Sequence, residues 1–434
     1  MFSNLNFKKI HITTLGCKVN QYESDVMLEE LMKYGCIKAE EGEAADIYII
    51  NTCSVTNMAD KKSRQMISRM HRANPEAIIA ATGCYVQASG NELVEKGIVD
   101  VIISNNRKSS VARILSEFML NGKTTNNFSD INKDPDFENM TLYMPENHTR
   151  AYIKIQDGCN NFCTYCIIPY LRGRIRSKKC SDIINEVKTL AENGTKEIIL
   201  TGINVSSYKD GDYELKDIIK LISEIKGVER IRMSSIEPRA ITEEFLEVVS
   251  KLENFCPHFH LSLQSACNKT LKAMNRHYTI EEYADTCRRI REVFDRPAIT
   301  TDVIVGFPGE TDEDFEDTYK HLSEISLYEM HVFKYSRRKG TIADKLPDQV
   351  DERIKNIRSS RLLELTADQK KEFEDSFKGT AQDVLIEEII SIDDKLYFRG
   401  HTTRYILVYI PVDTITDDMS KKESFINTIV STVL

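Results

Sequence analysis

The chain has 434 residues, of which 41% are hydrophobic and 29% are charged, and this balance excludes wholesale disorder. Its formal net charge is −9, from 58 basic and 67 acidic side chains, so it lacks the strongly basic balance of a general nucleic-acid-binding protein. Apolar runs such as 405–412 are far shorter than the ~18 residues of a membrane helix, and no secretory signal is visible, so we expect a cytoplasmic protein without membrane contact.

Residues 1–120 alternate between strand-like and helix-like stretches. The expected strands are apolar and cover 9–15, 46–51, 77–81 and 99–104, and helical patterns cover 21–34 and 58–72. Strands that alternate with helices predict an N-terminal α/β domain built on a parallel sheet. The next segment, 121–149, is polar, rich in Asn and weakly periodic, which is typical of a linker.

A second alternating series predicts a central domain over residues 150–374. Its expected strands cover 151–156, 197–201, 230–234, 258–263, 299–305 and 330–335. Its expected helices cover 182–192, 215–225, 242–252, 280–293 and 313–325. Six βα units in about 220 residues favour a partial (βα)6 barrel of the TIM type, and an open doubly wound sheet is the alternative.

The chain ends with a charged helix over 351–377 and a C-terminal domain over residues 375–434. Three strand-like stretches, 383–390, 396–400 and 405–412, predict a small antiparallel β barrel of the OB type. This domain carries 6 basic and 10 acidic side chains, so its net charge does not favour RNA binding.

The cysteines carry the clearest chemical signal. There are 11, an odd number in a chain without an export signal, which argues against a disulfide framework. Cys159, Cys163 and Cys166 form a C-x3-C-x2-C run directly after the first expected barrel strand. Three thiolates on one loop can hold three irons of a [4Fe-4S] cluster and leave the fourth iron open to another ligand. A structural zinc site is less favoured, because zinc usually takes four ligands and no fourth Cys or His is nearby.

The run GCNNFCTYC, with an aromatic residue before the last cysteine, resembles the radical S-adenosylmethionine (SAM) superfamily. The resemblance implies that the open iron binds the amino and carboxylate groups of SAM. It also implies that reduction cleaves SAM into methionine and a 5′-deoxyadenosyl radical.

A second set of cysteines, Cys17, Cys53 and Cys84, follows three expected strands of the N-terminal domain. Carboxyl ends of parallel strands gather at one edge of a sheet, so these thiols could converge, although three buried structural cysteines would fit the spacing equally well. The surrounding words TLGCKVNQ, NTCSV and TGC, with the barrel run, resemble the methylthiotransferases. The resemblance implies a second [4Fe-4S] cluster on these cysteines that takes part in sulfur insertion, and a C-terminal TRAM domain.

The word TLGCKVNQYES is most similar to the branch of this family that modifies C2 of N6-threonylcarbamoyladenosine at position 37 of tRNA. The resemblance therefore implies tRNA as partner and a tRNA methylthiotransferase activity. Three alternatives remain open: the same chemistry on isopentenyladenosine of tRNA, the same chemistry on an aspartate of a ribosomal protein, and a non-catalytic iron–sulfur RNA-binding redox sensor. The sulfur donor, the electron donor and the oligomeric state are not indicated by the sequence.

Polar residues at or near the ends of the barrel strands are candidates for SAM binding: Asn204, Ser235, Glu237 and Gln264. Two basic stretches, 172–179 and 334–339, are candidates for contacts with RNA phosphates. His258 and His260 alternate on one strand, which leaves core and substrate-facing roles open, and metal ligation is not expected. The other cysteines lack cluster spacing and are expected to be structural: Cys36, Cys180, Cys256, Cys267 and Cys287.

Overall fold

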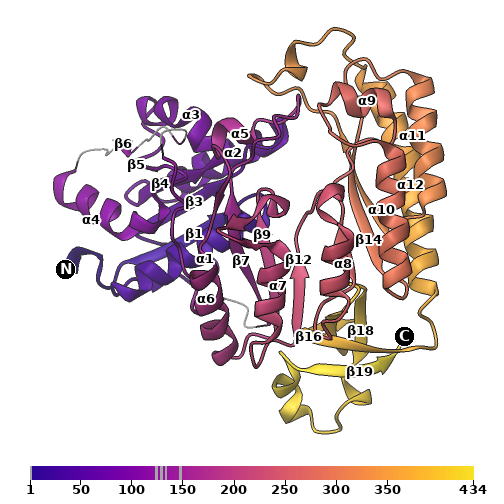
Figure 1. Ribbon diagram of the computed structural model, residues 1–434. Helices are drawn as coiled ribbons and strands as arrows, with labels where there is room; N and C mark the ends of the chain where they lie inside the picture. The colour runs from indigo at the N-terminus through magenta and orange to yellow at the C-terminus, as the bar shows by residue number, and fades with distance from the viewer. Residues whose placement is uncertain (1, 123–125, 128–130, 132–133, 146–148) are drawn as a thin grey trace.

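A computed structural model describes residues 2–122, 126–127, 131, 134–145 and 149–434. Three parts follow one another along the chain (Figure 1): an N-terminal α/β unit, a central barrel, and a C-terminal antiparallel sheet beneath the barrel. Within the described part of the chain, no helix is long and apolar enough to cross a membrane.

The N-terminal unit is a parallel sheet with strand order β2-β1-β3-β4-β5-β6. Its strands are β1 (Lys9–Thr14), β2 (Ile37–Lys38), β3 (Ile47–Thr52), β4 (Ile78–Gly83), β5 (Val101–Ile103) and β6 (Asn126–Asn127). Its helices are α1 (Lys18–Lys33), α2 (Asn57–Ala73), α3 (Cys84–Glu95) and α4 (Val111–Asn121). The sequence predicted the parallel sheet and the first two helices; α3 and α4 are additional. The chain order reverses between β1 and β3, and such a reversal is where open α/β sheets bind ligands.

The central part is a barrel that is open on one side. Its parallel strands are β7 (Arg150–Asp157), β9 (Glu197–Gly202), β12 (Arg230–Met233), β13 (His258–His260), β14 (Ala298–Val305) and β15 (Glu329–Lys334). They lie side by side in chain order, because parallel bridges link the β12 region to the β13 region. Among the described residues, β15 does not pair with β7. A doubly wound sheet would reverse its strand order, so the partial (βα)6 barrel is confirmed.

The barrel helices cover the outside of the strands, and several begin at strong local signals. The helices are α5 (Ile168–Leu171), α6 (Cys180–Glu192), α7 (Leu215–Ser223), α8 (Glu243–Val249), α9 (Asn268–Ala273), α10 (Ile280–Val293), α11 (Asp312–Ile325) and α12 (Glu352–Asp375). Capping boxes start α10 at Thr279 and α11 at Thr311, each with an acidic side chain three residues on. Short strands β8 (Arg176–Ser177), β10 (Lys209–Asp210) and β11 (Tyr213–Glu214) lie at the edge or between these elements.

The C-terminal part is a curled antiparallel sheet of order β18-β17-β16-β19, a half-barrel as expected for a TRAM-like domain. Its strands are β16 (Ala381–Ile392), β17 (Lys395–Thr402), β18 (Leu407–Pro411) and β19 (Ile429–Val433). Arg230 and Arg232, at the start of β12, donate hydrogen bonds to carbonyl groups of this sheet and its turn. The half-barrel therefore closes the barrel end opposite to the carboxyl ends of the strands.

Helix α1 joins the N-terminal unit to the barrel, because it lies between the N-terminal sheet and strands β7 and β9 (Figure 1). One apolar core runs continuously from Met27 and Leu31 of α1 to Ile153 of β7. Met140 and Leu142, inside the predicted linker 121–149, are buried in this core. Residues 123–125, 128–130, 132–133 and 146–148 of that segment lie outside the described residues. The domain boundaries at 120, 149 and 374 stay predictions.

Candidate functional site

The barrel cysteines occupy the loop that follows β7. Gly158 makes the turn with φ +72°, and an added Cβ would collide with the carbonyl oxygen of Arg174. The amide of Cys159 donates to the carbonyl of Gly173 at 3.1 Å, and the amide of Cys166 donates to that of Cys163 at 2.9 Å. The loop is therefore fixed by its own backbone at the carboxyl end of a barrel strand, where barrel enzymes place their active sites.

The three thiols of this loop lie within electrostatic range of one another. The pKa of Cys166 is raised to about 12, chiefly by burial and in smaller part by the nearby Cys163 and Cys159. The Cys163 sulfur accepts a hydrogen bond from Arg276 at 3.4 Å, and the Cys159 sulfur accepts one from the amide of Asn161 at 3.5 Å. Three convergent thiols with N–H donors at their sulfurs fit a [4Fe-4S] cluster held by three ligands.

The N-terminal cysteines come from three different strand ends. Cys17 follows β1 as the N-cap of α1, Cys53 follows β3, and Cys84 follows β4 as the first residue of α3. An added Cβ on Gly16 would lie only 2.8 Å from the Cys53 sulfur. Burial raises the pKa of Cys53 to about 11, with smaller contributions from Cys84 and Cys17. The sheet thus brings together the three thiols, at the reversal of strand order, and they fit a second three-ligand cluster.

A cavity of ≈ 540 Å³ opens beside Cys17. It is lined by residues of all three parts of the chain, including Lys18 of α1, Arg150 and Tyr152 of β7, and Glu387 of β16. Cys17 is exposed, whereas Cys53 and Cys84 are buried. The N-terminal cysteine site is therefore open to solvent at Cys17.

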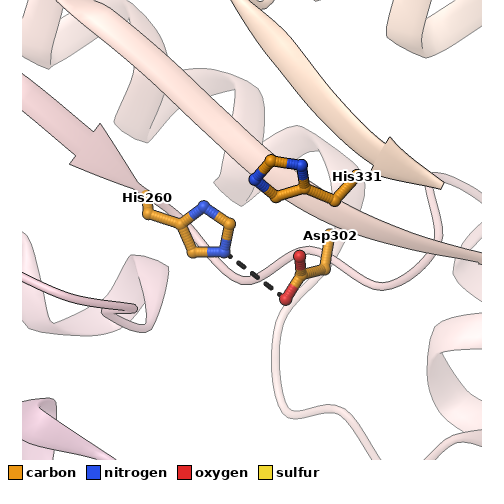
Figure 2. A group of neighbouring side chains, drawn as sticks. All are labelled: His260, Asp302 and His331. Atoms are coloured by element: carbon orange, nitrogen blue, oxygen red, sulfur yellow. Dashed lines mark ion pairs between the residues drawn. The ribbon is translucent and has the colours of Figure 1, made fainter. Parts of the chain in front are cut away.

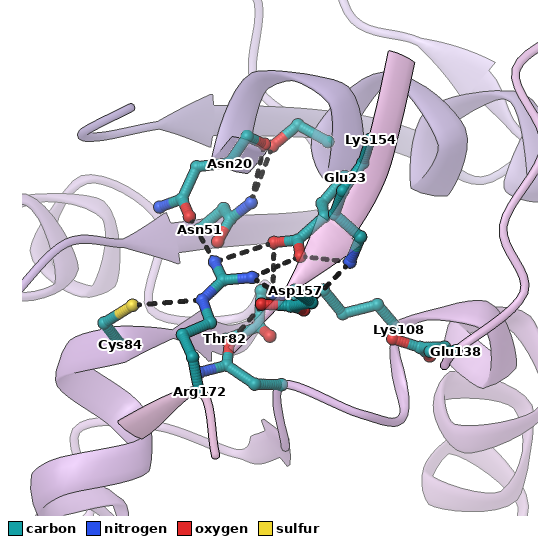
Figure 3. Close-up of polar contacts among 12 residues, drawn as sticks. Asn20, Glu23, Asn51, Thr82, Cys84, Lys108, Glu138, Lys154, Asp157 and Arg172 are labelled. Carbon is teal, nitrogen blue, oxygen red and sulfur yellow. Dashed lines mark hydrogen bonds and ion pairs between the residues drawn. The ribbon is translucent and has the colours of Figure 1, made fainter. Parts of the chain in front are cut away.

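Arg172 links the two cysteine sites (Figure 3). It follows α5, six residues after Cys166, yet its Nε donates to the Cys84 sulfur at 3.4 Å. Its other nitrogens donate to Asn20 Oδ1 at 2.6 Å and to the Glu23 carboxylate, and a longer contact of 3.5 Å reaches Asp157. One fully buried side chain therefore touches a ligand of the N-terminal site and the strand end that carries the barrel site.

Arg172 belongs to a buried network of charges in which Glu23 and Asp157 are ionised. Burial favours the neutral form of Glu23, but Arg172, Lys108 and Lys154 together hold the pKa of that carboxyl well below its usual value. Burial likewise acts against the charge of Asp157, and Lys154 and Arg172 lower its pKa instead. Lys154 Nζ donates to Glu23 at 2.8 Å and lies 3.2 Å from Asp157. Loss of one partner from such a network is strongly destabilising, because it leaves another buried charge unpaired.

The four residues predicted to bind SAM are not equally placed. Asn204 and Glu237 lie beside Cys159. Burial raises the pKa of that thiol; the negative charge of Glu237 adds to this rise, and a hydrogen bond from Asn204 opposes it. Glu237 also pairs with Arg276 at 3.4 Å. Ser235 is exposed just after β12, and Gln264 has φ +76° with its backbone bonded to Asp302 and Ile304. SAM binding by these four residues stays a prediction.

The prediction that two basic stretches contact RNA is wrong for four of their residues. Arg172, Arg176 and Lys178 of the first basic stretch are buried, as is Arg338 of the second, which pairs with Asp60. The remaining members of the two stretches are exposed and stay candidates: Arg174, Lys179, Lys334, Arg337 and Lys339. The sequence shows these cations as a basic run, but it does not show that some of them neutralise buried carboxylates. The five cysteines expected to be structural are all buried.

Arg276 was not predicted from the sequence. It donates to the Cys163 sulfur and to the carbonyl of Ser262, and its Nε bonds to Tyr278 at 2.9 Å. Nothing in the local sequence distinguishes it from other arginines, because its partners lie on distant loops.

Two known sequence families match the two cysteine sites separately. Residues 153–322 match the Radical SAM superfamily and contain the three barrel cysteines. Residues 9–104 match the uncharacterized protein family UPF0004 and contain the three N-terminal cysteines.

Curated relatives match nearly the whole chain. The threonylcarbamoyladenosine tRNA methylthiotransferase MtaB of Bacillus subtilis is 39% identical over 414 residues, which cover 94% of this chain and 91% of that protein. The protein of the same name from Aquifex aeolicus is 39% identical, with 88% and 93% covered. A tRNA-2-methylthio-N(6)-dimethylallyladenosine synthase of Clostridium botulinum is 36% identical, with 95% and 93% covered.

Solved structures share the fold at low sequence identity. The radical S-adenosylmethionine methyltransferase TsrM from Kitasatospora setae gives a TM-score of 0.59 at 14% identity, covering 78% of this chain and 77% of that one. The cobalamin-dependent S-adenosylmethionine radical enzyme OxsB gives 0.54 at 12% identity, covering 94% and 65%. Both likenesses agree with an α/β unit joined to a partial barrel.

Proposed function

Because this chain belongs to the tRNA methylthiotransferase family of radical SAM enzymes, we propose that it replaces the C2 hydrogen of N6-threonylcarbamoyladenosine at position 37 of tRNA with a methylthio group. The structural observation that carries this proposal is the pair of three-cysteine sites joined by Arg172. Because tRNA is its substrate, we place the enzyme in the cytoplasm as part of the same proposal.

The choice of nucleoside rests on the relatives and on the sequence around Cys17. The two relatives named for threonylcarbamoyladenosine are each 39% identical to this chain, and those named for dimethylallyladenosine are 36–37% identical. The word TLGCKVNQYES favours the same branch. Dimethylallyladenosine of tRNA, which is the isopentenyladenosine named above, is the second candidate substrate.

The cofactors are SAM and two [4Fe-4S] clusters. We assign Cys159, Cys163 and Cys166 to the cluster that binds SAM, and Cys17, Cys53 and Cys84 to the second cluster. When bound and reduced, the cluster on the barrel cysteines supplies a deoxyadenosyl radical from SAM. Such a radical can act on the C2–H bond, which is not acidic enough for a general base to activate.

The protein's own residues position these groups. Asn204 and Glu237 lie beside Cys159 and can bind polar parts of SAM, with Ser235 and Gln264 as further candidates at the strand ends. Arg276 holds both Glu237 and the Cys163 sulfur, and thereby fixes the distance between a cluster ligand and a proposed SAM contact. Arg172 holds Cys84 against the β7 end that carries the barrel loop. Such fixed spacing favours transfer between two groups over side reactions.

The exposed cations are the proposed contacts to the tRNA backbone. Arg174 and Lys179 follow the barrel cysteine loop, Lys334 ends β15, and Arg337 and Lys339 follow that strand. Apart from Lys179, these cations lie at or just beyond the carboxyl ends of barrel strands, so phosphates bound there would hold the anticodon loop over the site.

Analysis of modified nucleosides tests the proposal. The chain would be expressed in a bacterial strain lacking its own threonylcarbamoyladenosine methylthiotransferase, and digested total tRNA would be analysed by mass spectrometry. We expect 2-methylthio-N6-threonylcarbamoyladenosine to appear. In a strain that also lacks its own isopentenyladenosine methylthiotransferase, the 2-methylthio derivative of the isopentenyl nucleoside would move the proposal to the second substrate.

A matched control separates failure of activity from failure of expression. The Cys163→Ala variant, expressed equally, should give no product. Product at the level of the unchanged chain in this variant would refute the barrel cluster assignment. A chain that loads both clusters but forms no 5′-deoxyadenosine on reduction would support the redox sensor instead.

A further inference from the structure

A group of three polar side chains inside the barrel is not used by the cysteine sites. His260, Asp302 and His331 come from three neighbouring strands, β13, β14 and β15, and their side chains point toward one another (Figure 2). One possible ligand atom from each residue lies within 4.8 Å of the other two. The imidazole rings of His260 and His331 stack with their centroids 5.6 Å apart.

Strand alternation places all three side chains on the interior face of the barrel. On β14, Val303 and Val305 pack in the core against the outer helices, so Asp302 faces the other way. The same alternation applies to Phe259 beside His260 and to Met330 beside His331. Asp302 and His331 are also direct cross-strand partners.

We propose that His260, Asp302 and His331 bind a divalent transition-metal ion, for which zinc is the best match, and leave at least one coordination position open to the barrel interior. Two imidazoles and one carboxylate are a donor set that zinc and related ions accept. From the sequence, metal ligation by His260 was not expected, because Asp302 and His331 are far away along the chain. The inference does not depend on the tRNA substrate.

The separation of His260 and Asp302 suits coordination better than a hydrogen bond. His260 Nε2 lies 3.4 Å from Asp302 Oδ2. A charge-assisted hydrogen bond is usually ~2.8 Å long, whereas two ligands of a tetrahedral zinc with bonds of ~2.1 Å are ~3.4 Å apart. His331 is exposed, and one of its ring nitrogens lies within 4.8 Å of the ligand atoms of His260 and Asp302.

A neighbouring hydroxyl orients the first ligand. His260 Nδ1 lies 2.9 Å from Thr300 Oγ1, so its Nε2 is the nitrogen that faces Asp302. A hydrogen bond at the second ring nitrogen is the usual way in which a metal-binding histidine is fixed. The side chains of His260 and Asp302 are 12% and 30% exposed, so an ion can reach them.

The adjacent His258 lies on the same face of β13 as His260, and its ring stacks on Tyr405 with the ring centroids 5.3 Å apart. Lys18, which directly follows Cys17, lies within electrostatic range of His258. The barrel interior near the proposed metal site is therefore close to the N-terminal cysteine site. An ion with an open position there could bind an oxygen or nitrogen atom of a molecule in the barrel.

Metal analysis of the cluster-loaded protein tests this site. Protein with both clusters would be incubated with zinc chloride, freed of excess by gel filtration, and analysed for zinc and iron by mass spectrometry. We expect about one zinc per chain, and about eight irons per chain from the two clusters. X-ray absorption at the zinc edge should show N/O ligands and no Zn–S distance near ~2.3 Å.

Conservative variants separate this site from adventitious binding. Asp302→Asn and His331→Gln should lower bound zinc at least about tenfold while the iron content stays unchanged. His71→Ala, on α2 of the N-terminal unit, should keep full zinc and serves as the matched control. Absence of zinc from the unchanged protein, or full zinc in both His331→Gln and Asp302→Asn, would overturn the proposal. Zn–S ligation would do the same, because it would place the metal on cysteines.

Discussion

The two cysteine sites use the same residue type but are built in different ways. The barrel site takes three cysteines from one loop of eight residues, 159–166, whose backbone bonds fix it after β7. The N-terminal site takes one cysteine from each of three strand ends, 36 and 31 residues apart, and depends on the parallel sheet to bring them together. The barrel site therefore depends on the local structure of one loop, whereas the N-terminal site depends on the tertiary structure of the sheet.

This difference predicts which changes harm one site and which harm both. A change within the barrel loop should leave the N-terminal site loaded, because the sheet does not need the loop to form. Arg172 is the exception, since it belongs to the barrel but contacts Cys84. Iron content, SAM cleavage and stability together separate the effects on the two sites.

The largest effect is expected from removal of one cysteine at each site. Cys163→Ala should retain about four irons per chain, lose SAM cleavage, and lose product formation by more than about 10³-fold. Cys53→Ala should also retain about four irons and lose product, but should still cleave SAM. Iron analysis and 5′-deoxyadenosine assays on both variants measure this split.

Cys287→Ala is the control for loss of a buried thiol, because Cys287 is buried in the barrel core away from both sites. It should keep about eight irons and full SAM cleavage. Equal loss of SAM cleavage in Cys53→Ala and Cys163→Ala would show that the two clusters do not load independently.

The contrast also explains what sequence reasoning could achieve. The spacing of Cys159, Cys163 and Cys166 predicts their convergence, because one loop cannot hold them far apart. The spacing of Cys17, Cys53 and Cys84 leaves three buried structural thiols equally acceptable, and only the strand order settles their proximity. Arg172 was predicted to face RNA, because local sequence shows a basic run but not the distant Glu23 and Asp157 that neutralise it. His331 was missed for the same reason: its partners lie on other strands.

A second pair of variants tests the glycines that precede the cysteines. Gly158→Ala strains a residue with φ +72° and collides with a fixed carbonyl, so the barrel loop should fail to load its cluster. Gly16→Ala places a Cβ 2.7 Å from that of Cys53 at φ +107°, so the N-terminal site should fail instead. Each variant should keep about four irons per chain.

Gly42→Ala is the matched control, because Gly42 has φ +83° but no atom within 4 Å of an added Cβ. It carries the backbone strain without the collision and should load both clusters. Loss of iron in Gly42→Ala would mean that strain alone, rather than crowding at the cysteines, explains the other two variants.

Arg172→Met should weaken the link between the sites without removing a cysteine. It leaves Asn20 and the buried carboxylate of Glu23 short of a partner, which we expect to cost about 3–5 kcal/mol of stability. It also removes an N–H donor from the Cys84 sulfur, which should lower the reduction potential of the N-terminal cluster. Chemical unfolding and redox titration followed by electron paramagnetic resonance measure the two effects.

Arg174→Met is the control, since Arg174 is exposed two residues further on and lies over the Phe162 ring at 4.5 Å. Its unfolding midpoint and N-terminal potential should match those of the unchanged protein. An unchanged N-terminal potential in Arg172→Met would separate this arginine from the cluster and leave it a purely structural role.

The smallest effect concerns acid stability of the same network. The pKa of Glu23 and of Asp157 is lower in the folded protein than the ordinary values of 4.5 and 3.8. Their ionised forms therefore stabilise the fold fully above about pH 5, and this contribution is lost as the pH falls through the folded-state pKa values. Asp157→Asn should lower the unfolding midpoint at pH 7 and flatten its decline between pH 5 and the acid limit.

Thermal unfolding followed by circular dichroism measures both curves, with Asp212→Asn, an exposed turn residue, as control. The Asp212→Asn curve should run parallel to that of the unchanged protein at every pH. Because Asp157 ends β7 and accepts a hydrogen bond from the Gly158 amide at 2.8 Å, its loss should also loosen the barrel loop. A variant that declines as steeply as the unchanged protein would mean that Glu23 alone carries the acid sensitivity, and that the link between the two sites is anchored on α1 rather than on the barrel strand.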